Sequence, residues 1–354
     1  MKKVYFTVGP TQTNPNFVKH IAKAIRLRIP SISHRSDDFH KIYAELDGNL
    51  KKLWKIPSDY KILFFSSATE IWDRLAQNCV QKDSLHFVTG SFGEKHAKAI
   101  EAYGKTSFIV KNDFIDERIL TENVKKHKNI EYIAFTHNES SMGVKTPENL
   151  INKVKKISPK SLVVVDAVSS APLPKFNFKN IDGVYFSVQK CFGLPAGLGV
   201  LIASPRLIDK SKILEKKQLY IGTYHGFPKM MKMYEKWETV ETPNVLNIYL
   251  LNEAVKDMAK LGLSEIRKIN KTNKIRIIEY MKEKFGVLPA VQKPIFHSDT
   301  VLVFDTGEKT AEIKKNFAKK GVIVGSGYGE KKISQIRIAN FPQHAKVTQK
   351  LFTT

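Results

Sequence analysis

The stretch that decides the fold is Ser161-Leu162-Val163-Val164-Val165-Asp166. After its serine it is apolar and rich in valine until the final carboxylate, which is typical of a parallel strand buried on both faces. Ligands of open α/β sheets gather at the carboxyl ends of such strands, so Asp166 is expected at a binding edge. The common alternative for an Asp in this position is a helix cap or a turn.

Short apolar runs alternate with amphipathic segments on both sides of this stretch, from about residue 61 to 205. Strands alternating with helices indicate a mainly parallel sheet covered on both faces. We predict seven strands, at 61–65, 85–88, 107–110, 132–136, 162–166, 183–186 and 199–202. The helical patterns between them include 70–80, 94–103 and 147–157.

The pattern changes at Pro243, where a long helical region begins and runs to about Phe285. It is followed by a strand at 300–304, a helix at 310–319, strands near 322–324 and 334–338, and a last helix. We therefore expect a large domain over residues 1–242 and a smaller α+β domain over residues 243–354. The N-terminal segment 1–15 could pack with the smaller domain.

The composition is that of an ordinary globular protein, with 42% hydrophobic and 26% charged residues among 354. No apolar run approaches the roughly 20 residues that span a bilayer, and the apolar segment at the N-terminus is too short for a signal peptide. Cys79 and Cys191 are the only cysteines, which cannot form a disulfide framework and fit a reducing compartment. We expect a cytoplasmic protein without membrane contacts.

The formal net charge of +24 raises the possibility of nucleic-acid binding. The lysines are scattered, however, in pairs such as Lys51-Lys52, Lys155-Lys156 and Lys331-Lys332, and no recognised DNA- or RNA-binding motif accompanies them. We interpret the charge as a solvated, lysine-rich surface that steers small anionic substrates, and we expect no nucleic-acid partner. A nucleic-acid-binding protein built on an inactive enzyme scaffold is the rival interpretation.

Gln189-Lys190 follows the apolar run Gly183-Val184-Tyr185-Phe186 and lies 24 residues after Asp166. An aldehyde cofactor such as pyridoxal phosphate needs a lysine amine to hold it and an acid to keep its pyridine nitrogen protonated. Lys190 and Asp166 could supply these two groups. In so lysine-rich a chain, however, any single lysine is more often a solvated surface residue.

Several segments occur together in the order seen in class V aminotransferases, which are pyridoxal-phosphate enzymes of fold type I. The chain resembles that family over nearly its whole length, and within the class it is most similar to the phosphoserine aminotransferases. The segments are Gly9-Pro10-Thr11, Ser33-His34-Arg35-Ser36, Ser67-Ala68-Thr69, Thr89-Gly90-Ser91-Phe92, Asn138-Glu139-Ser140, Asp166-Ala167-Val168-Ser169-Ser170, Gln189-Lys190, Glu241-Thr242-Pro243 and Ile336-Arg337-Ile338-Ala339-Asn340.

The resemblance implies a set of cofactor residues. Lys190 would form the Schiff base and Asp166 would face the ring nitrogen. Ala68 and Thr69 would form the loop that binds the cofactor phosphate, and the amide of Gln189 would donate to the same phosphate. Phe92 would stack on the cofactor ring, and the hydroxyl of Ser140 would bind its phenolic oxygen. Read locally, Ser and Thr at a strand-to-helix junction are most often N-caps, and Phe92 and Ser140 are ordinary core and loop residues.

The resemblance also implies substrate contacts and a homodimer with shared active sites. Thr242 would reach the cofactor phosphate of the partner subunit, although Glu241 replaces an asparagine common in the family. Arg337 would bind the substrate carboxylate through its planar fork. The substrate phosphate would meet three basic residues, His34, Arg35 and Lys331. Glu330 stands beside Lys331 where relatives carry histidine.

We therefore expect a pyridoxal-phosphate-dependent aminotransferase acting on phosphoserine and 2-oxoglutarate, with no metal. An alanine–glyoxylate or serine–pyruvate aminotransferase shares most of the motifs and is the nearest alternative. A cysteine desulfurase is disfavoured, because neither Cys79 nor Cys191 falls in the late mobile-loop position and Phe92 replaces that family's ring-stacking histidine.

Overall fold

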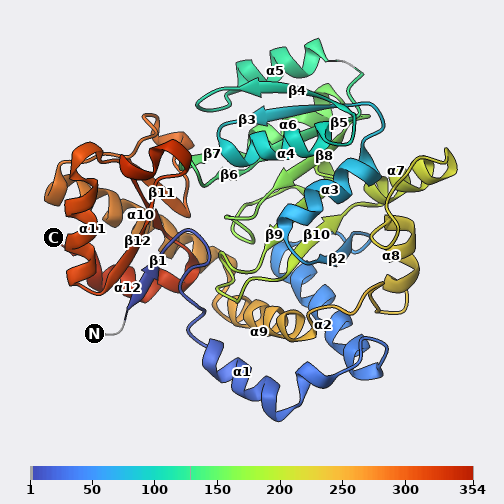
Figure 1. Cartoon of the computed structure of the whole chain (residues 1–354), viewed down its shortest axis with the longest axis horizontal. Coiled ribbons are helices and arrows are strands. Elements are labelled where there is room, and N and C mark those ends of the chain that lie inside the picture. Colours follow the sequence, from blue (N-terminus) through green and yellow to red (C-terminus); the bar gives the residue numbers. More distant parts are fainter. Residues whose placement is uncertain (1–2, 128, 354) are drawn as a thin grey trace.

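The computed structural model describes residues 3–127 and 129–353 and contains a large and a smaller β-sheet, side by side (Figure 1). The large sheet has seven strands, and only β10 runs antiparallel to its neighbours. This arrangement confirms the predicted fold class. In spatial order the strands are β2 (Lys61–Phe65), β10 (Gly199–Ala203), β9 (Gly183–Ser187), β8 (Leu162–Asp166), β5 (Tyr132–Thr136), β3 (Asp83–Val88) and β4 (Thr106–Lys111).

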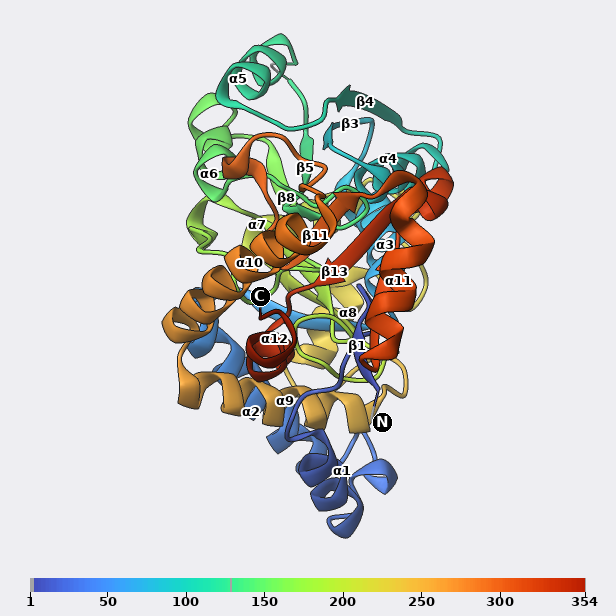
Figure 2. The same ribbon diagram turned by 90° about the vertical axis from the view of Figure 1, so that its left-hand side faces the viewer.

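Helices cover both faces of this sheet. In two perpendicular views α3 (Ala68–Cys79) and α4 (Ser91–Glu101) lie on one face, and α6 (Glu148–Ile157) lies on the other (Figures 1 and 2). Because the sheet is covered on both sides, every residue of the central strands β5, β8 and β9 is buried. The other helices of this body are α1 (Phe17–Arg26), α2 (Asp37–Trp54), α5 (Glu117–Lys126), α7 (Pro205–Lys216), α8 (Phe227–Tyr234) and α9 (Val245–Leu261).

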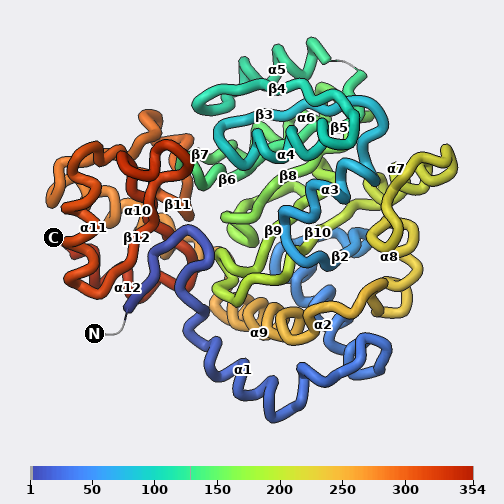
Figure 3. The backbone as a smooth tube through the Cα atoms, in the orientation of Figure 1, coloured from blue at the N-terminus to red at the C-terminus, as the bar shows by residue number. Residues whose placement is uncertain are grey.

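The smaller sheet joins the two ends of the chain. Its strands, in spatial order, are β1 (Val4–Phe6), β12 (Val322–Ser326), β13 (Gln335–Ala339) and β11 (Val301–Asp305). β1 pairs in parallel with β12, so the N-terminal segment lies inside the C-terminal body (Figure 3). The helices α10 (Leu263–Phe285), α11 (Thr310–Lys319) and α12 (Ala345–Leu351) belong to the same body.

The long helical region expected after Pro243 is two helices. Gly262 lies between the end of α9 and the start of α10. Its φ is 83°, and a positive φ of this size favours glycine. The apolar residues of α9 belong to the core of the large sheet, where α9 packs on α2. The second half of α10 contributes Ile277, Tyr280 and Met281 to the core of the small sheet. We therefore propose that the two domains divide near Gly262, with β1 assigned to the small domain.

A short hairpin, β6 (Asn138–Glu139) and β7 (Val144–Lys145), follows β5 and lies between the two sheets (Figure 1). Across residues 3–127 and 129–353, we find no helix with the length and apolar character needed to span a bilayer.

Candidate active site

A cleft beyond the carboxyl ends of β5, β8 and β9 brings together residues from five separate segments. Seven of the predicted cofactor residues line it: Ala68, Thr69, Phe92, Ser140, Asp166, Gln189 and Lys190. The strand ends supply Thr136, Asp166 and Ser187, since parallel strands present their carboxyl ends at one edge.

Lys190 follows β9 in a turn, and the residue is half-buried. Its Nζ donates a hydrogen bond to the carbonyl oxygen of Val8 at 2.7 Å. The neighbouring Gly9 has φ of 143°, and a Cβ at this position would collide with the Lys190 side chain. Burial, together with the positive charge of Arg337, lowers the pKa of Lys190 to about 8. The amine is therefore much closer to its nucleophilic, neutral form than an ordinary lysine.

This low pKa predicts the labelling behaviour of the cofactor-free protein. A lysine amine reacts only when neutral, so acetylation of Lys190 is expected to rise with a midpoint near pH 8, against about 10.4 for an ordinary lysine. Competitive labelling with acetic anhydride, with N-acetyl-lysine as internal standard and peptide mass spectrometry as readout, measures the midpoint. Arg337→Gln should move it upward because a nearby positive charge is removed. An unchanged midpoint in that variant would contradict the assigned cause.

Asp166 ends β8 with its carboxylate buried in the floor of the cleft. The backbone N–H of Val168 donates to Oδ1 at 2.8 Å, and the Tyr185 hydroxyl donates to Oδ2 at 3.2 Å. Burial raises the pKa of Asp166 to about 7, well above its ordinary range. A buried carboxyl of this kind gains most from a cationic partner, since an opposite charge offsets the cost of burying its own.

A polar cluster behind Asp166 was not identified from the sequence. The Tyr185 hydroxyl accepts a hydrogen bond from Trp72 Nε1 at 2.7 Å and lies 3.3 Å from His96 Nδ1. Burial lowers the pKa of His96 to about 3, so the imidazole is neutral. Tyr185 is the register partner of Asp166 on β9, a pairing that becomes visible only once the strand order is known.

The N-terminus of α3 forms one wall of the cleft. Ser67 caps the helix by accepting the N–H of Glu70 at 3.1 Å, and the N–H of Ala68 donates to the Ser187 hydroxyl at 3.0 Å. The amides at a helix N-terminus attract anions through the helix dipole. Facing this wall, Gln189 has a buried Oε1 without a hydrogen-bond partner among the described residues.

Glu139 fixes the position of Phe92 and is a second residue missed from the sequence. Its Oε2 accepts the backbone N–H groups of Phe92 at 2.9 Å and Gly93 at 3.2 Å, where α4 begins. Its Oε1 accepts both the N–H and the hydroxyl of Ser141. The ring of Phe92 lies 5.2 Å from that of Tyr328, which belongs to the small sheet's connections. Glu139 belongs to the motif Asn138-Glu139-Ser140, in which the sequence predicted a role only for the serine.

Arg337, on β13 of the small sheet, lies beside the cleft, next to its lining residue Ser140. Its Nε donates to the Ser326 carbonyl at 2.7 Å, and its Nη1 donates to the Ser140 carbonyl at 3.2 Å. The ion pairs of the described residues include none for Arg337. Two carbonyls thus hold the guanidinium in place while its charge stays available for an incoming carboxylate.

Thr242 lies in a different cleft, beside Glu70 and His225. His225 bridges two carboxylates, with Nε2 2.9 Å from Glu241 Oε2 and Nδ1 next to Glu70. Although burial opposes it, hydrogen bonding to Glu241 and Glu70 raises the pKa of His225. Glu241, which departs from the family pattern, therefore faces an imidazolium of its own chain.

The residues expected to meet a substrate phosphate lie outside the cleft that contains Lys190 of the same chain. Arg35 forms an ion pair with Glu238 and donates to the Thr239 carbonyl at 3.0 Å. Burial, together with the charge of Arg35, lowers the pKa of His34. Lys331 is exposed on the 3₁₀ turn Gly329–Ile333, as is Glu330 beside it.

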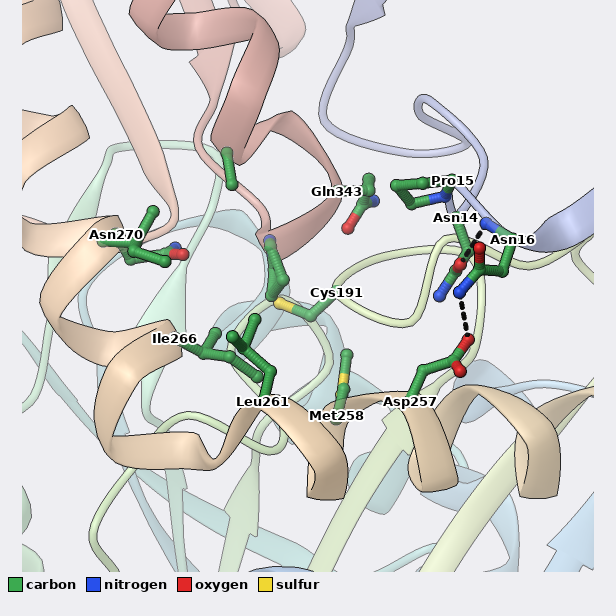
Figure 4. Close-up of a pocket in the computed structure, with 13 residues that line it drawn as sticks. Asn14, Pro15, Asn16, Cys191, Asp257, Met258, Leu261, Ile266, Asn270 and Gln343 are labelled. Carbon is green, nitrogen blue, oxygen red and sulfur yellow. Dashed lines mark hydrogen bonds between the residues drawn. The ribbon is translucent and has the colours of Figure 1, made fainter.

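A separate cavity lies on the other side of the Lys190 turn, between the start of the chain and α9, α10 and α12 (Figure 4). Cys191 forms part of its wall, and burial raises the pKa of this thiol, which makes it unsuited to act as a nucleophile. Gln343, at the rim, donates to the Lys190 carbonyl at 2.8 Å. Gln343 therefore supports the Lys190 turn, and the cavity adds no reactive group to it.

The model of the class V aminotransferase family matches residues 4–338. The chain belongs to this family. A solved phosphoserine aminotransferase from Cytophaga hutchinsonii is 40% identical to this class V aminotransferase, with a TM-score of 0.92 over 99% of this chain and 97% of the other. A phosphoserine aminotransferase from Rhodococcus opacus is 23% identical over 95% of this chain and 90% of its own.

A solved alanine–glyoxylate aminotransferase from Nostoc sp. is 18% identical, with a TM-score of 0.83 over 99% of this chain and 94% of the other, and so shares the fold. The expected family and fold type are confirmed, and the protein is an aminotransferase.

Proposed function

We propose that this aminotransferase moves an amino group between phosphoserine and 2-oxoglutarate, giving 3-phosphohydroxypyruvate and glutamate, with pyridoxal phosphate as cofactor. The observation that carries the proposal is the cleft in which Lys190, Asp166 and the N-terminus of α3 converge. The substrate is supported by the 40% identity to a phosphoserine aminotransferase over almost the whole chain.

The residues of the cleft fit pyridoxal phosphate. Lys190 offers a half-buried amine of low pKa. Asp166 offers a buried carboxyl that lacks a cationic partner at hydrogen-bond distance among the described residues. The backbone amides at the start of α3 and the side-chain NH₂ of Gln189 are hydrogen-bond donors at the wall of the cleft, and they suit the phosphate group. Phe92 and Ser140 also line the cleft; the ring of Phe92 suits the cofactor ring, and the hydroxyl of Ser140 suits its phenolic oxygen.

When bound, pyridoxal phosphate supplies an aldehyde that accepts the amino group and a ring that draws electrons from the substrate α-carbon. In our proposal Lys190 first holds the cofactor, and its freed Nζ then carries a proton from the α-carbon as general base. Asp166 keeps a proton on the ring nitrogen. Arg337 holds the substrate carboxylate and so orients the α-hydrogen towards Nζ.

We further propose a homodimer with shared sites. Thr242 lies outside the cleft of its own chain, and Arg35, bonded to the Thr239 carbonyl, lies close to the same segment. A partner subunit would bring Thr242 to the cofactor phosphate, and His34 and Arg35 to the substrate phosphate. Lys331 would reach that phosphate from the small domain. Cys79 and Cys191 are both free and buried, which is consistent with our proposal of a cytoplasmic location.

Mixing two inactive variants tests the shared site. Lys190→Ala removes the reactive amine, and Thr242→Glu places a carboxylate where the cofactor phosphate is expected. In a mixed dimer one cleft then combines a native Lys190 with a native Thr242 from the other chain. After joint refolding at equal amounts, we expect roughly a quarter of wild-type activity. Activity that stays at the sum of the two parents, or a fully active monomer by light scattering, would refute the shared site.

Substrate preference tests the proposed function itself. We expect kcat/KM to be higher for phosphoserine than for serine or alanine. Arg35→Ala should lower the phosphoserine value about 10- to 100-fold, because a charge-assisted contact to phosphate is lost, while leaving the other two nearly unchanged. Arg26→Ala, an exposed arginine on α1, serves as the matched control. If alanine or serine is the better donor in the wild type, the alanine–glyoxylate assignment replaces ours.

A further inference from the structure

A second polar cleft lies where α10 meets the large domain, and we call it the α10 cleft. The large domain contributes His137, Asn138, Lys145, Glu148, Ser170 and the segment 173–175, and the small domain contributes Arg267, Asn270, Lys271, Lys274, residues 294–295, Asp299 and Thr300. Asn138 also lines the candidate active site, so the two clefts are neighbours. None of the cofactor or substrate residues proposed above lines the α10 cleft.

The lining of the α10 cleft is strongly basic. Five cationic side chains, Lys145, Lys175, Arg267, Lys271 and Lys274, face it together with two carboxylates, Glu148 and Asp299, a formal excess of three positive charges. Arg267, Lys271 and Lys274 follow one another at helical spacing and so share one face of α10. An excess of like charge in one concave space favours an anion that neutralises it.

The two carboxylates are already committed. Asp299 accepts Lys145 Nζ at 2.6 Å on one oxygen and Lys274 Nζ at 2.5 Å on the other. Glu148 accepts the backbone N–H of Lys175 at 3.3 Å. Arg267 has no carboxylate partner among the described ion pairs, and its Nε donates to the Leu173 carbonyl at 2.6 Å. Arg267, Lys175 and Lys271 form no ion pair among the described residues, and the single charge of Glu148, which acts on Arg267, cannot offset all three.

One buried group in the lining points to a ligand. The side chain of His137 is only 4% exposed, and its Nε2 has no hydrogen-bond partner among the described residues. The nearest carboxylate oxygen, Oε1 of Glu148, is 3.7 Å away, beyond hydrogen-bond length. The other ring nitrogen, Nδ1, is 2.9 Å from the Ser170 hydroxyl. If Ser170 donates this bond, Nε2 carries the proton and faces the cleft as a donor.

We propose that the α10 cleft is a binding site for a small anion with two or three negative charges, carried on carboxylate or phosphate oxygens. Arg267 and Lys271 from the small domain and the Nε2–H of His137 from the large domain are its recognition groups. A lone monovalent ion would leave most of the excess charge unmatched, so a compact multivalent anion fits better. The bound anion bridges the two domains and is distinct from the substrate.

Calorimetric titration of the cofactor-saturated protein tests this proposal, with citrate, inorganic phosphate and chloride as probes at constant ionic strength. We expect one citrate site per chain, with affinity at least about tenfold above that for chloride. Arg267→Gln and Lys271→Gln should each weaken citrate binding by about fivefold or more. Lys268→Gln, which removes an exposed charge from the same helix without touching the cleft, should leave it unchanged. Lys271 is itself exposed, so its replacement tests the site even if Arg267→Gln misfolds.

A further variant separates this site from the candidate active site. Arg337→Gln should keep citrate binding, because Arg337 is not among the residues that line the α10 cleft. Loss of binding in Arg337→Gln with retention in Lys271→Gln would overturn the proposal, as would equal losses in Lys268→Gln and Lys271→Gln. The absence of any citrate heat that exceeds the heat of dilution would also overturn it.

Discussion

Replacing Lys190 with alanine is expected to lower kcat/KM for amino transfer by about 10⁴-fold or more, the largest effect of any single change in this chain. Lys190 has two tasks in the proposed reaction, since its Nζ holds the cofactor and then carries the proton. Among the residues that the structure describes, no other amine lines the candidate active site. An alanine leaves the cofactor bound only by its phosphate and ring contacts. Steady-state kinetics with purified protein measure the loss.

The covalent link gives a second readout of the same prediction. Borohydride reduction of the wild-type protein with its cofactor should attach the label to the peptide that contains Lys190, and the alanine variant should take up none. Lys98→Ala, an exposed lysine on α4, is the matched control and should keep both label and activity. A label on any other lysine would refute the role assigned to Lys190.

Asp166→Asn should lower kcat/KM by about 10²- to 10³-fold, because a neutral amide cannot stabilise a protonated ring nitrogen as a carboxylate does. The change preserves shape, since the amide oxygen can still accept the Val168 N–H and the amide NH₂ can donate to the Tyr185 hydroxyl. The fold should therefore be retained while activity falls.

The Asp166→Asn change should raise the stability of the cofactor-free protein although it lowers activity. The pKa of Asp166 is raised from 3.8 to about 7 in the folded, cofactor-free protein, so the folded state holds more protons than the unfolded state between these values. The contribution of Asp166 to stability therefore decreases as pH rises through this window. Asn lacks this dependence. In urea unfolding of the cofactor-free proteins, the free energy of unfolding of Asp166→Asn should exceed that of the wild type at pH 8, and the difference should be smaller at pH 5.

A matched buried carboxylate distinguishes this outcome from general damage. Asp182 is also buried, but it pairs with Lys155 at 2.6 Å and lies just before β9, at the amino ends of the strands. Asp182→Asn should lose stability at every pH while keeping kcat. If both variants lose stability and activity alike, the special position of Asp166 is refuted.

The parallel core was predictable from the sequence because its strands are buried on both faces. β5 and β8 have the predicted bounds, Tyr132–Thr136 and Leu162–Asp166, since a continuous apolar run ends where the strand leaves the core. The direction of β10 was not predictable, because local sequence is the same for either orientation. α2 was not singled out, and the division of α9 from α10 depends on one glycine, Gly262.

The site residues divide in the same way. Lys190 and Asp166 belong to ordered motifs and could be singled out along the chain. The partners that tune them could not, since Tyr185, His96 and the Val8 carbonyl meet the site only through tertiary packing. Glu139 belongs to one of the motifs, yet its role depends on the backbone N–H of Phe92 in the first turn of α4, 47 residues earlier. Opposite-charge partners such as Glu238 for Arg35 are likewise distant in sequence.

The parallel pairing of β1 with β12 has a consequence for synthesis on the ribosome. The strand β1 cannot find its partner until residues 322–326 have emerged, more than three hundred residues later. The carbonyl of Val8, two residues after β1, receives the hydrogen bond of Lys190. A nascent chain can therefore fold its large sheet early while its reactive lysine still lacks this acceptor. The amine reaches its final setting only after β12, far downstream of Lys190, has been synthesised and has paired with β1.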